Sequence, residues 1–140
     1  MSSSRAGHWG ALLVGAFLLS ACGSGEAEVR TDTATTATSE CAHVIDVVVA
    51  ESGDTYSFAV TVASDETGWD KYADGWELRA PDGEVLGFHE LLHPHVEEQP
   101  FTRSLGGVAV PAGVMVVTVA AKDSVLGYCG ETFDITLPGR

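Results

Sequence analysis

The chain has 140 residues, with 7 basic against 20 acidic side chains and a formal net charge of −13 at pH 7. This length fits one domain of ordinary size. The scarcity of Lys and Arg excludes nucleic acid as a partner, because phosphate backbones are bound by clusters of basic side chains. Anionic lipid head groups should repel the chain for the same reason.

The first predicted element is a secretory signal peptide over residues 1–21. Arg5 stands in a short polar opening and is followed by the uncharged run from Trp9 to Ala21, which is the layout of such a signal. These 13 apolar or small residues are too few to cross a bilayer, since a spanning helix needs about 20 residues. We expect the segment to be removed, which leaves 119 residues.

The signal ends in the motif Leu19-Ser20-Ala21-Cys22. This motif resembles the lipobox of bacterial lipoproteins. The resemblance implies cleavage before Cys22 and attachment of diacylglycerol to its sulfur. The protein would then be anchored to a cell membrane by acyl chains such as palmitate, facing the periplasm or the cell exterior. Each buried methylene adds about 0.8 kcal/mol to such an anchor. The alternative is an ordinary secreted protein in which Cys22 is an unpaired thiol.

The segment from Cys22 to Glu40 is predicted to be a flexible, Thr-rich linker. Val29 is its only large apolar residue, so the segment cannot bury enough surface to become ordered. As a flexible coil it would span about 20 to 25 Å. We expect it to lift a domain formed by residues 41–140 off the membrane.

From Cys41 onward, short runs with alternating apolar residues predict an all-β domain. About seven strands match the size of an immunoglobulin-like or fibronectin-type β-sandwich, which the domain resembles in architecture. The stretch from Trp76 to Tyr128 is also similar to small bacterial exported domains of no assigned function. The expected strands are Val44–Ala50, Thr55–Ala63, the segment around Trp76 to Arg79, Val85–Glu90, Phe101–Val110, Val114–Ala121 and Thr132–Leu137.

With Cys22 taken by lipid, Cys41 and Cys129 remain. Disulfides persist outside the cytoplasm, so we expect these two to pair. The alternative is two separate buried thiols. A catalytic thiol is disfavoured, because neither residue lies in a Cys-x-x-Cys motif or beside an evident base. Cys41 precedes the first predicted strand and Cys129 the last, unlike the disulfide of true immunoglobulin domains. The bridge would therefore join the two ends of the domain.

Three of the five histidines, His89, His93 and His95, fall within seven residues. Pro94 favours an extended backbone at His93, and residues two apart in an extended chain point the same way. His93 and His95 could therefore face one ion, with His89 and Glu98 completing the set. Such donors suit copper or zinc. The alternative is a surface loop with half-solvated imidazoles.

An acidic segment suggests a calcium loop, but its spacing is wrong. If Asp70 took the first position of an EF-hand, Tyr72 would take the third and Pro81 the twelfth, where a Glu is needed. A solvated acidic turn is the better interpretation of Asp65, Glu66, Asp70 and Asp74.

Trp69, Tyr72 and Trp76 place three aromatic side chains within eight residues. Exposed aromatics could stack on sugar rings or anchor a protein partner, whereas buried ones would pack in the core. We expect Trp76 to belong to the core of its strand. For Trp69 and Tyr72 both interpretations stay open, and they are the candidate binding residues.

No enzyme motif accompanies these features. The sequence has no Gly-x-Ser-x-Gly elbow, no phosphate-binding glycine loop and no His-Glu-x-x-His helix. We therefore predict a non-enzymatic, membrane-anchored module that binds an unknown protein or small ligand. The alternative is an extracytoplasmic copper- or zinc-binding protein that uses His89, His93, His95 and Glu98.

Overall fold

The computed structural model describes residues 40–140. The expected signal peptide, Cys22 and nearly all of the linker lie outside the described residues. Within 40–140 no helix is long and apolar enough to cross a membrane, and every regular element is a strand, as the sequence predicts. The strands are β1 (His43–Ser52), β2 (Thr55–Ala63), β3 (Ala73–Arg79), β4 (Val85–Glu90), β5 (Phe101–Val108), β6 (Val116–Asp123) and β7 (Phe133–Thr136).

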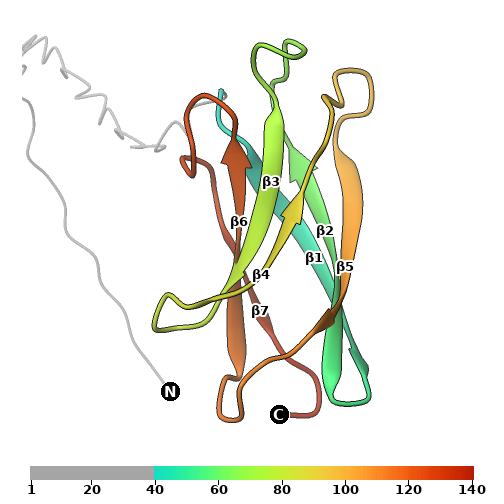
Figure 1. The fold of residues 1–140 in the computed structure, drawn as a ribbon, viewed down its shortest axis with the longest axis vertical. Coiled ribbons are helices and arrows are strands. Elements are labelled where there is room, and N and C mark those ends of the chain that lie inside the picture. Colours follow the sequence, from blue (N-terminus) through green and yellow to red (C-terminus); the bar gives the residue numbers. More distant parts are fainter. Residues whose placement is uncertain (1–39) are drawn as a thin grey trace, which may run out of the picture. The chain divides into compact units, whose positions relative to one another are not determined.

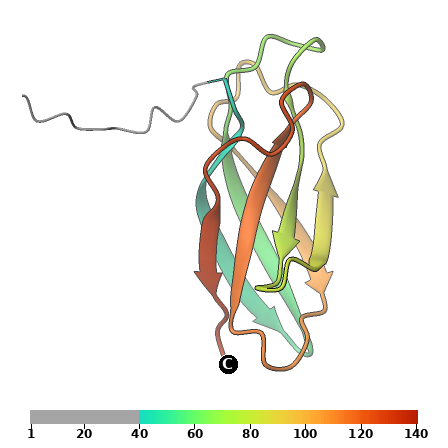
Figure 2. The ribbon, with the colours of Figure 1, turned by 90° about the vertical axis from the view of Figure 1, so that its left-hand side faces the viewer.

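The strands form two antiparallel sheets that pack face to face (Figures 1 and 2). One sheet has the order β1-β2-β5 and the other the order β4-β3-β6-β7. The predicted two-sheet β-sandwich of seven strands is therefore confirmed. The edges of the sheets meet along two seams, where β1 lies near β7 and β4 lies near β5.

The core lies between the sheets because alternate residues of each strand point inward. In β2 the inward residues include Phe58 and Val60, and the opposite sheet contributes Trp76, Leu78 and Val119, all with no exposed surface. Each such side chain stabilises the fold by about 1.5 to 3 kcal/mol through its burial. Trp76 is thus a core residue, as expected.

The strands β5 and β6 each contain or adjoin a local irregularity. The pairing of β5 with β2 shifts register at Gly106 and Gly107, and Gly107 has a φ of 70°. Met115 lies directly before β6 and is half exposed, unlike Val117 and Val119, because the chain is still leaving the turn around Gly113.

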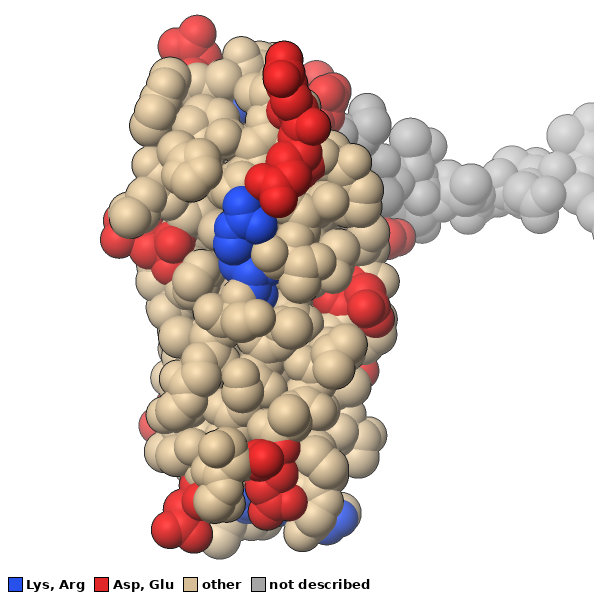
Figure 3. All heavy atoms as spheres, turned by 90° about the vertical axis from the view of Figure 1, so that its right-hand side faces the viewer, with Lys and Arg blue, Asp and Glu red and all other residues tan. Residues whose placement is uncertain are grey.

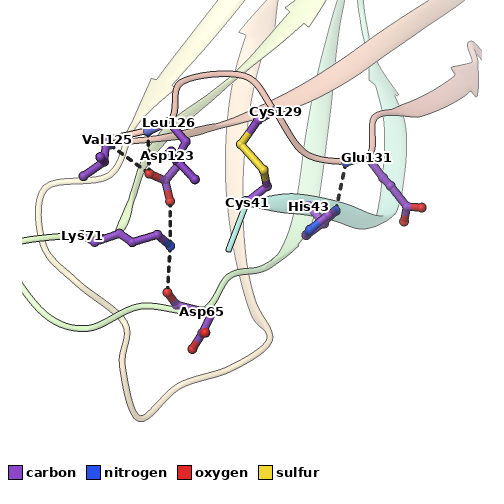
Figure 4. Close-up of a disulfide and its surroundings, with 9 residues drawn as sticks. All are labelled: Cys41, His43, Asp65, Lys71, Asp123, Val125, Leu126, Cys129 and Glu131. Carbon is purple, nitrogen blue, oxygen red and sulfur yellow. Dashed lines mark hydrogen bonds and ion pairs between the residues drawn. A yellow bond between two sulfur atoms is a disulfide. The ribbon is translucent and has the colours of Figure 1, made fainter. Parts of the chain in front are cut away.

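Cys41 and Cys129 form a disulfide (Figure 4), as expected from the sequence. The bridge connects Cys41, two residues before β1, to the loop between β6 and β7. Beside it, the backbone N–H of Glu131 donates to His43 Nδ1 over 2.9 Å. The backbones approach so closely that a Cβ at Gly130 would lie 1.8 Å from the carbonyl oxygen of Ala42. The two chain segments are therefore packed without space for a larger residue.

Candidate functional site

Three loops lie together at one end of the sandwich (Figure 1). They are residues 64–72 between β2 and β3, residues 91–100 between β4 and β5, and residues 124–132 between β6 and β7. These three loops are termed the loop end. The chain enters the described domain at this same end, at Glu40 and Cys41 (Figure 2).

The carboxylate of Glu66 joins the first two loops from beneath. It is buried and accepts hydrogen bonds from the backbone N–H of Ala73, over 3.2 Å, and from that of His95. Gln99 adds a second link, because its amide oxygen accepts from Ser64 N over 3.0 Å and its amide nitrogen donates to the His95 carbonyl over 3.2 Å. The sequence-based prediction of a solvated acidic turn is therefore wrong for Glu66. Its buried carboxylate holds two loops together through hydrogen bonds.

Asp123 holds loop 124–132 in place through hydrogen bonds (Figure 4). Its Oδ1 accepts from the backbone N–H groups of Val125 and Leu126, each over 2.9 Å, and its Oδ2 lies 3.1 Å from Lys71 Nζ. Burial raises the pKa of this carboxyl, but the two N–H donors and the Lys71 ammonium outweigh burial and hold the pKa below its ordinary value. Lys71 also donates to the carbonyl of Asp65. The charge of Asp123 thus connects loops 64–72 and 124–132.

Trp69 and Tyr72 lie on the central loop of the three. The Tyr72 backbone exchanges two hydrogen bonds with Ser124, which fixes its position. The Trp69 ring meets the Tyr72 ring edge-on with centroids 5.9 Å apart, yet Trp69 is 70% exposed. Trp69 is therefore not a core residue, and Tyr72 is half-buried beneath it.

Trp69 is one of several apolar side chains that the loop end leaves in solvent. Leu92 is 71% exposed, although its neighbour Leu91 is buried. Sequence reasoning missed Leu92, and its only signal was that adjacent residues of an extended segment point to opposite sides. The exposed apolar residues of the loop end are Trp69, Leu92, Val96, Val125, Leu126 and Tyr128.

The predicted histidine cluster is only partly assembled. His95 is buried against the Phe101 ring, with centroids 4.0 Å apart, and the His93 ring lies 4.6 Å from that of His95. His89 instead stacks on Trp76 at 5.0 Å. In the described part of the chain, no group of three or more His, Cys, Asp or Glu side chains could hold a metal ion. The sequence interpretation of half-solvated imidazoles was also wrong for His95.

Glu98, the fourth predicted metal ligand, pairs with a cation. Its two carboxylate oxygens accept from the two terminal nitrogens of Arg103, over 3.3 and 2.9 Å. This guanidinium lines a cavity of about 240 Å³ together with His89, His93 and His95. A fixed positive charge beside the imidazoles disfavours a second cation there.

The same environment disfavours protonation of two imidazoles. Burial lowers the pKa of His95, and the Arg103 guanidinium lowers it further, while the Glu66 carboxylate opposes the change. The pKa of His89 is lowered by burial and then by Arg103. Both rings are therefore neutral near pH 7 and act as flat packing groups.

A separate polar group lies on the outer face of β3. Glu77 accepts from the Tyr128 hydroxyl and from Arg79 Nε, each over 2.5 Å, and the Arg79 guanidinium lies 4.5 Å from the Tyr128 ring centroid. Burial, followed by the Glu77 carboxylate, raises the pKa of Tyr128 to about 12. Both carboxylate oxygens of Glu77 have partners within the group, so the group attaches loop 124–132 to the sheet.

No family model matches the chain. The chain is 40% identical over 112 residues to a protein of Halomicrobium mukohataei named "Putative lipoprotein". That match covers 76% of this chain and 54% of the relative, so the chain spans about half the length of the curated relative. Among solved structures it is similar to a hypothetical protein from Pyrococcus horikoshii OT3, with a TM-score of 0.47 and 13% identity, over 69% of this chain and 87% of that one.

The role of Glu66 predicts a loss of stability in Glu66→Gln. The new amide group would face backbone N–H donors with one acceptor fewer, and an unsatisfied buried partner costs about 1 to 3 kcal/mol. Urea unfolding should show a decrease of this size in the free energy of unfolding. Asp70→Asn, an exposed site on the same loop, is the matched control and should change it by under about 0.5 kcal/mol. Equal stability of the two variants would contradict the role given to Glu66.

The lowered pKa values of His89 and His95 predict a stability that depends on pH. Below their ordinary value of 6.5 the unfolded chain binds more protons than the folded one. The free energy of unfolding should therefore decrease as pH falls from about 6.5 to 5, a range in which carboxylates titrate little. His95→Phe keeps a flat ring without a proton site and should make this decrease shallower. An unchanged slope in urea unfolding at pH 5 to 7 would show that His95 does not contribute.

Proposed function

We propose that this chain is a membrane-anchored extracytoplasmic lipoprotein whose β-sandwich acts, without catalysis, as an interaction or ligand-binding module. Two observations support the anchor. Leu19-Ser20-Ala21-Cys22 resembles a lipobox and follows an apolar run of signal-peptide length. The relative that is 40% identical carries a lipoprotein name.

The observation that carries the binding role is the exposure of large apolar side chains on loops that are fixed in place. Trp69 and Leu92 are each about 70% exposed, and their loops are tied by Glu66. Tryptophan is enriched among residues that dominate binding energy, and an exposed apolar side chain on a fixed loop loses less conformational entropy on binding than one on a mobile loop. The loop end is therefore the surface with which we expect the module to bind.

The use of the buried charges supports a role without catalysis. Among residues 40–140 the buried carboxylates are Glu66, Glu77 and Asp123. Each binds backbone N–H groups or neighbouring side chains of the fold. A general base needs a lone pair directed at substrate. The lone pairs of these three carboxylates accept hydrogen bonds from groups of the fold instead.

The anchor predicts a defined mature N-terminus. Mass spectrometry of protein extracted from membranes should find Cys22 as the first residue, with diacylglycerol on its sulfur. Cys22→Ser removes the thiol that is alkylated, so this variant should appear in the soluble fraction. An unmodified Cys22, or a retained segment from Met1 to Ala21, would contradict the proposal.

The binding role predicts that the loop end is covered where the protein works. Hydroxyl-radical footprinting should oxidise Trp69 and Leu92 less in native cell envelopes than in the unanchored Cys22→Ser protein in buffer. Val48 on β1, 60% exposed, is the matched control and should react equally in both. Equal oxidation of Trp69 in the two samples would exclude the loop end as the binding surface.

A further inference from the structure

The loop end coincides with the place where the chain enters the domain (Figure 2). Cys41 is the second described residue, and its disulfide holds it to Cys129 in loop 124–132. The segment that leads back to Cys22 therefore starts among the loops that carry Trp69 and Val125, and not at the opposite end with the β1–β2 turn.

In place of the expectation that the linker holds the domain off the membrane, we propose that the loop end seats on the lipid bilayer that carries the anchor, with Trp69, Leu92 and Val125 entering the interface between head groups and acyl chains. This inference rests on the proposed lipid at Cys22 and names the occupant of the proposed binding surface. Tryptophan favours this interface because its ring is apolar and its N–H is polar.

Because the connecting segment is short, even a weak affinity of the loop end for the bilayer is sufficient to keep the two in contact. Nineteen residue steps separate Cys22 from Cys41, so Cys41, at the loop end, can never be more than about 65 Å from the lipidated residue. Confinement within this radius gives an effective concentration in the millimolar range. Three exposed apolar side chains on loops at the same end of the domain then suffice to keep the domain seated.

The negative charge at the loop end favours lipids with neutral head groups over lipids with anionic ones. Lys71 of the loop end pairs with Asp123, and Arg103 of the adjoining β5 pairs with Glu98, while Asp70 on the loop end is exposed. The face drawn in Figure 3 likewise shows more acidic than basic atoms. Seating is therefore driven by apolar contact and opposed by anionic head groups.

The test uses the full lipidated chain in protein-free vesicles of phosphatidylcholine with brominated acyl chains, which quench tryptophan at the depth of the lipid. After cleavage of the signal peptide the chain holds two tryptophans, Trp69 and the fully buried Trp76. We expect loss of most of the Trp69 emission and a blue shift of the remainder. Trp69→Phe should abolish the quenched fraction and leave the emission of Trp76.

Two further comparisons test whether apolar contact drives the seating of the loop end on lipid. Leu92→Ser combined with Val125→Ser should reduce the quenched fraction, whereas Val48→Ser on β1 should leave it unchanged. Replacing part of the phosphatidylcholine with phosphatidylglycerol should reduce quenching at low salt. Quenching should recover at about 1 M salt, where the Debye length is only about 3 Å. Stronger quenching by the anionic lipid would overturn the proposal.

The outcomes separate this inference from the proposed function. Trp69 emission that is the same in brominated and ordinary vesicles overturns seating on lipid. If Trp69 is nevertheless protected in native envelopes, its occupant is a protein, and the binding module stands without the lipid contact. If Trp69 is reactive in envelopes and unquenched in vesicles, both proposals fail.

Discussion

The arrangement of the loop end depends on the burial of one charge. A carboxylate can lie inside a protein only if donors replace the water it has lost. Glu66, in loop 64–72, obtains its donors from the backbone of Ala73 at the start of β3 and from that of His95 in loop 91–100. Moving either loop would leave the carboxylate short of a partner, so the positions of both loops are coupled.

The consequence is a surface in two layers. Beneath, Gln99 binds the backbone of Ser64 in loop 64–72, Glu66 that of His95 in loop 91–100, and Asp123 that of Val125 in loop 124–132. Above, Trp69 and Leu92 project into solvent from this fixed base. Side chains held in place before contact lose less conformational entropy on binding, so a small number of apolar residues can be effective. The stack of His95 on Phe101 connects this base to the core.

Local sequence was sufficient for the number and order of the strands, but not for all of their bounds, and it was insufficient for the loops. Alternation in the segment from Thr55 to Ala63 identifies β2 and its inward residues, because strand periodicity depends on neighbours along the chain. The burial of Glu66 and His95 depends on a contact between residues 29 apart, which no periodicity records. Trp69 was recognised as a candidate from its residue type, whereas its exposure follows only from how the three loops meet.

The disulfide also determines how the domain bears mechanical load. β1 is an edge strand, and a force that pulls the chain at Glu40 would, without a bridge, peel β1 from β2 one hydrogen-bonded pair after another. The bond between Cys41 and Cys129 transmits part of that force to the loop between β6 and β7, at a point in the chain before His43. Tension then divides between β1 and the loop that joins β6 to β7, so the two sheets share it. In the proposed anchored protein, the disulfide would thereby prevent the loss of strand pairing at the end where the force is applied.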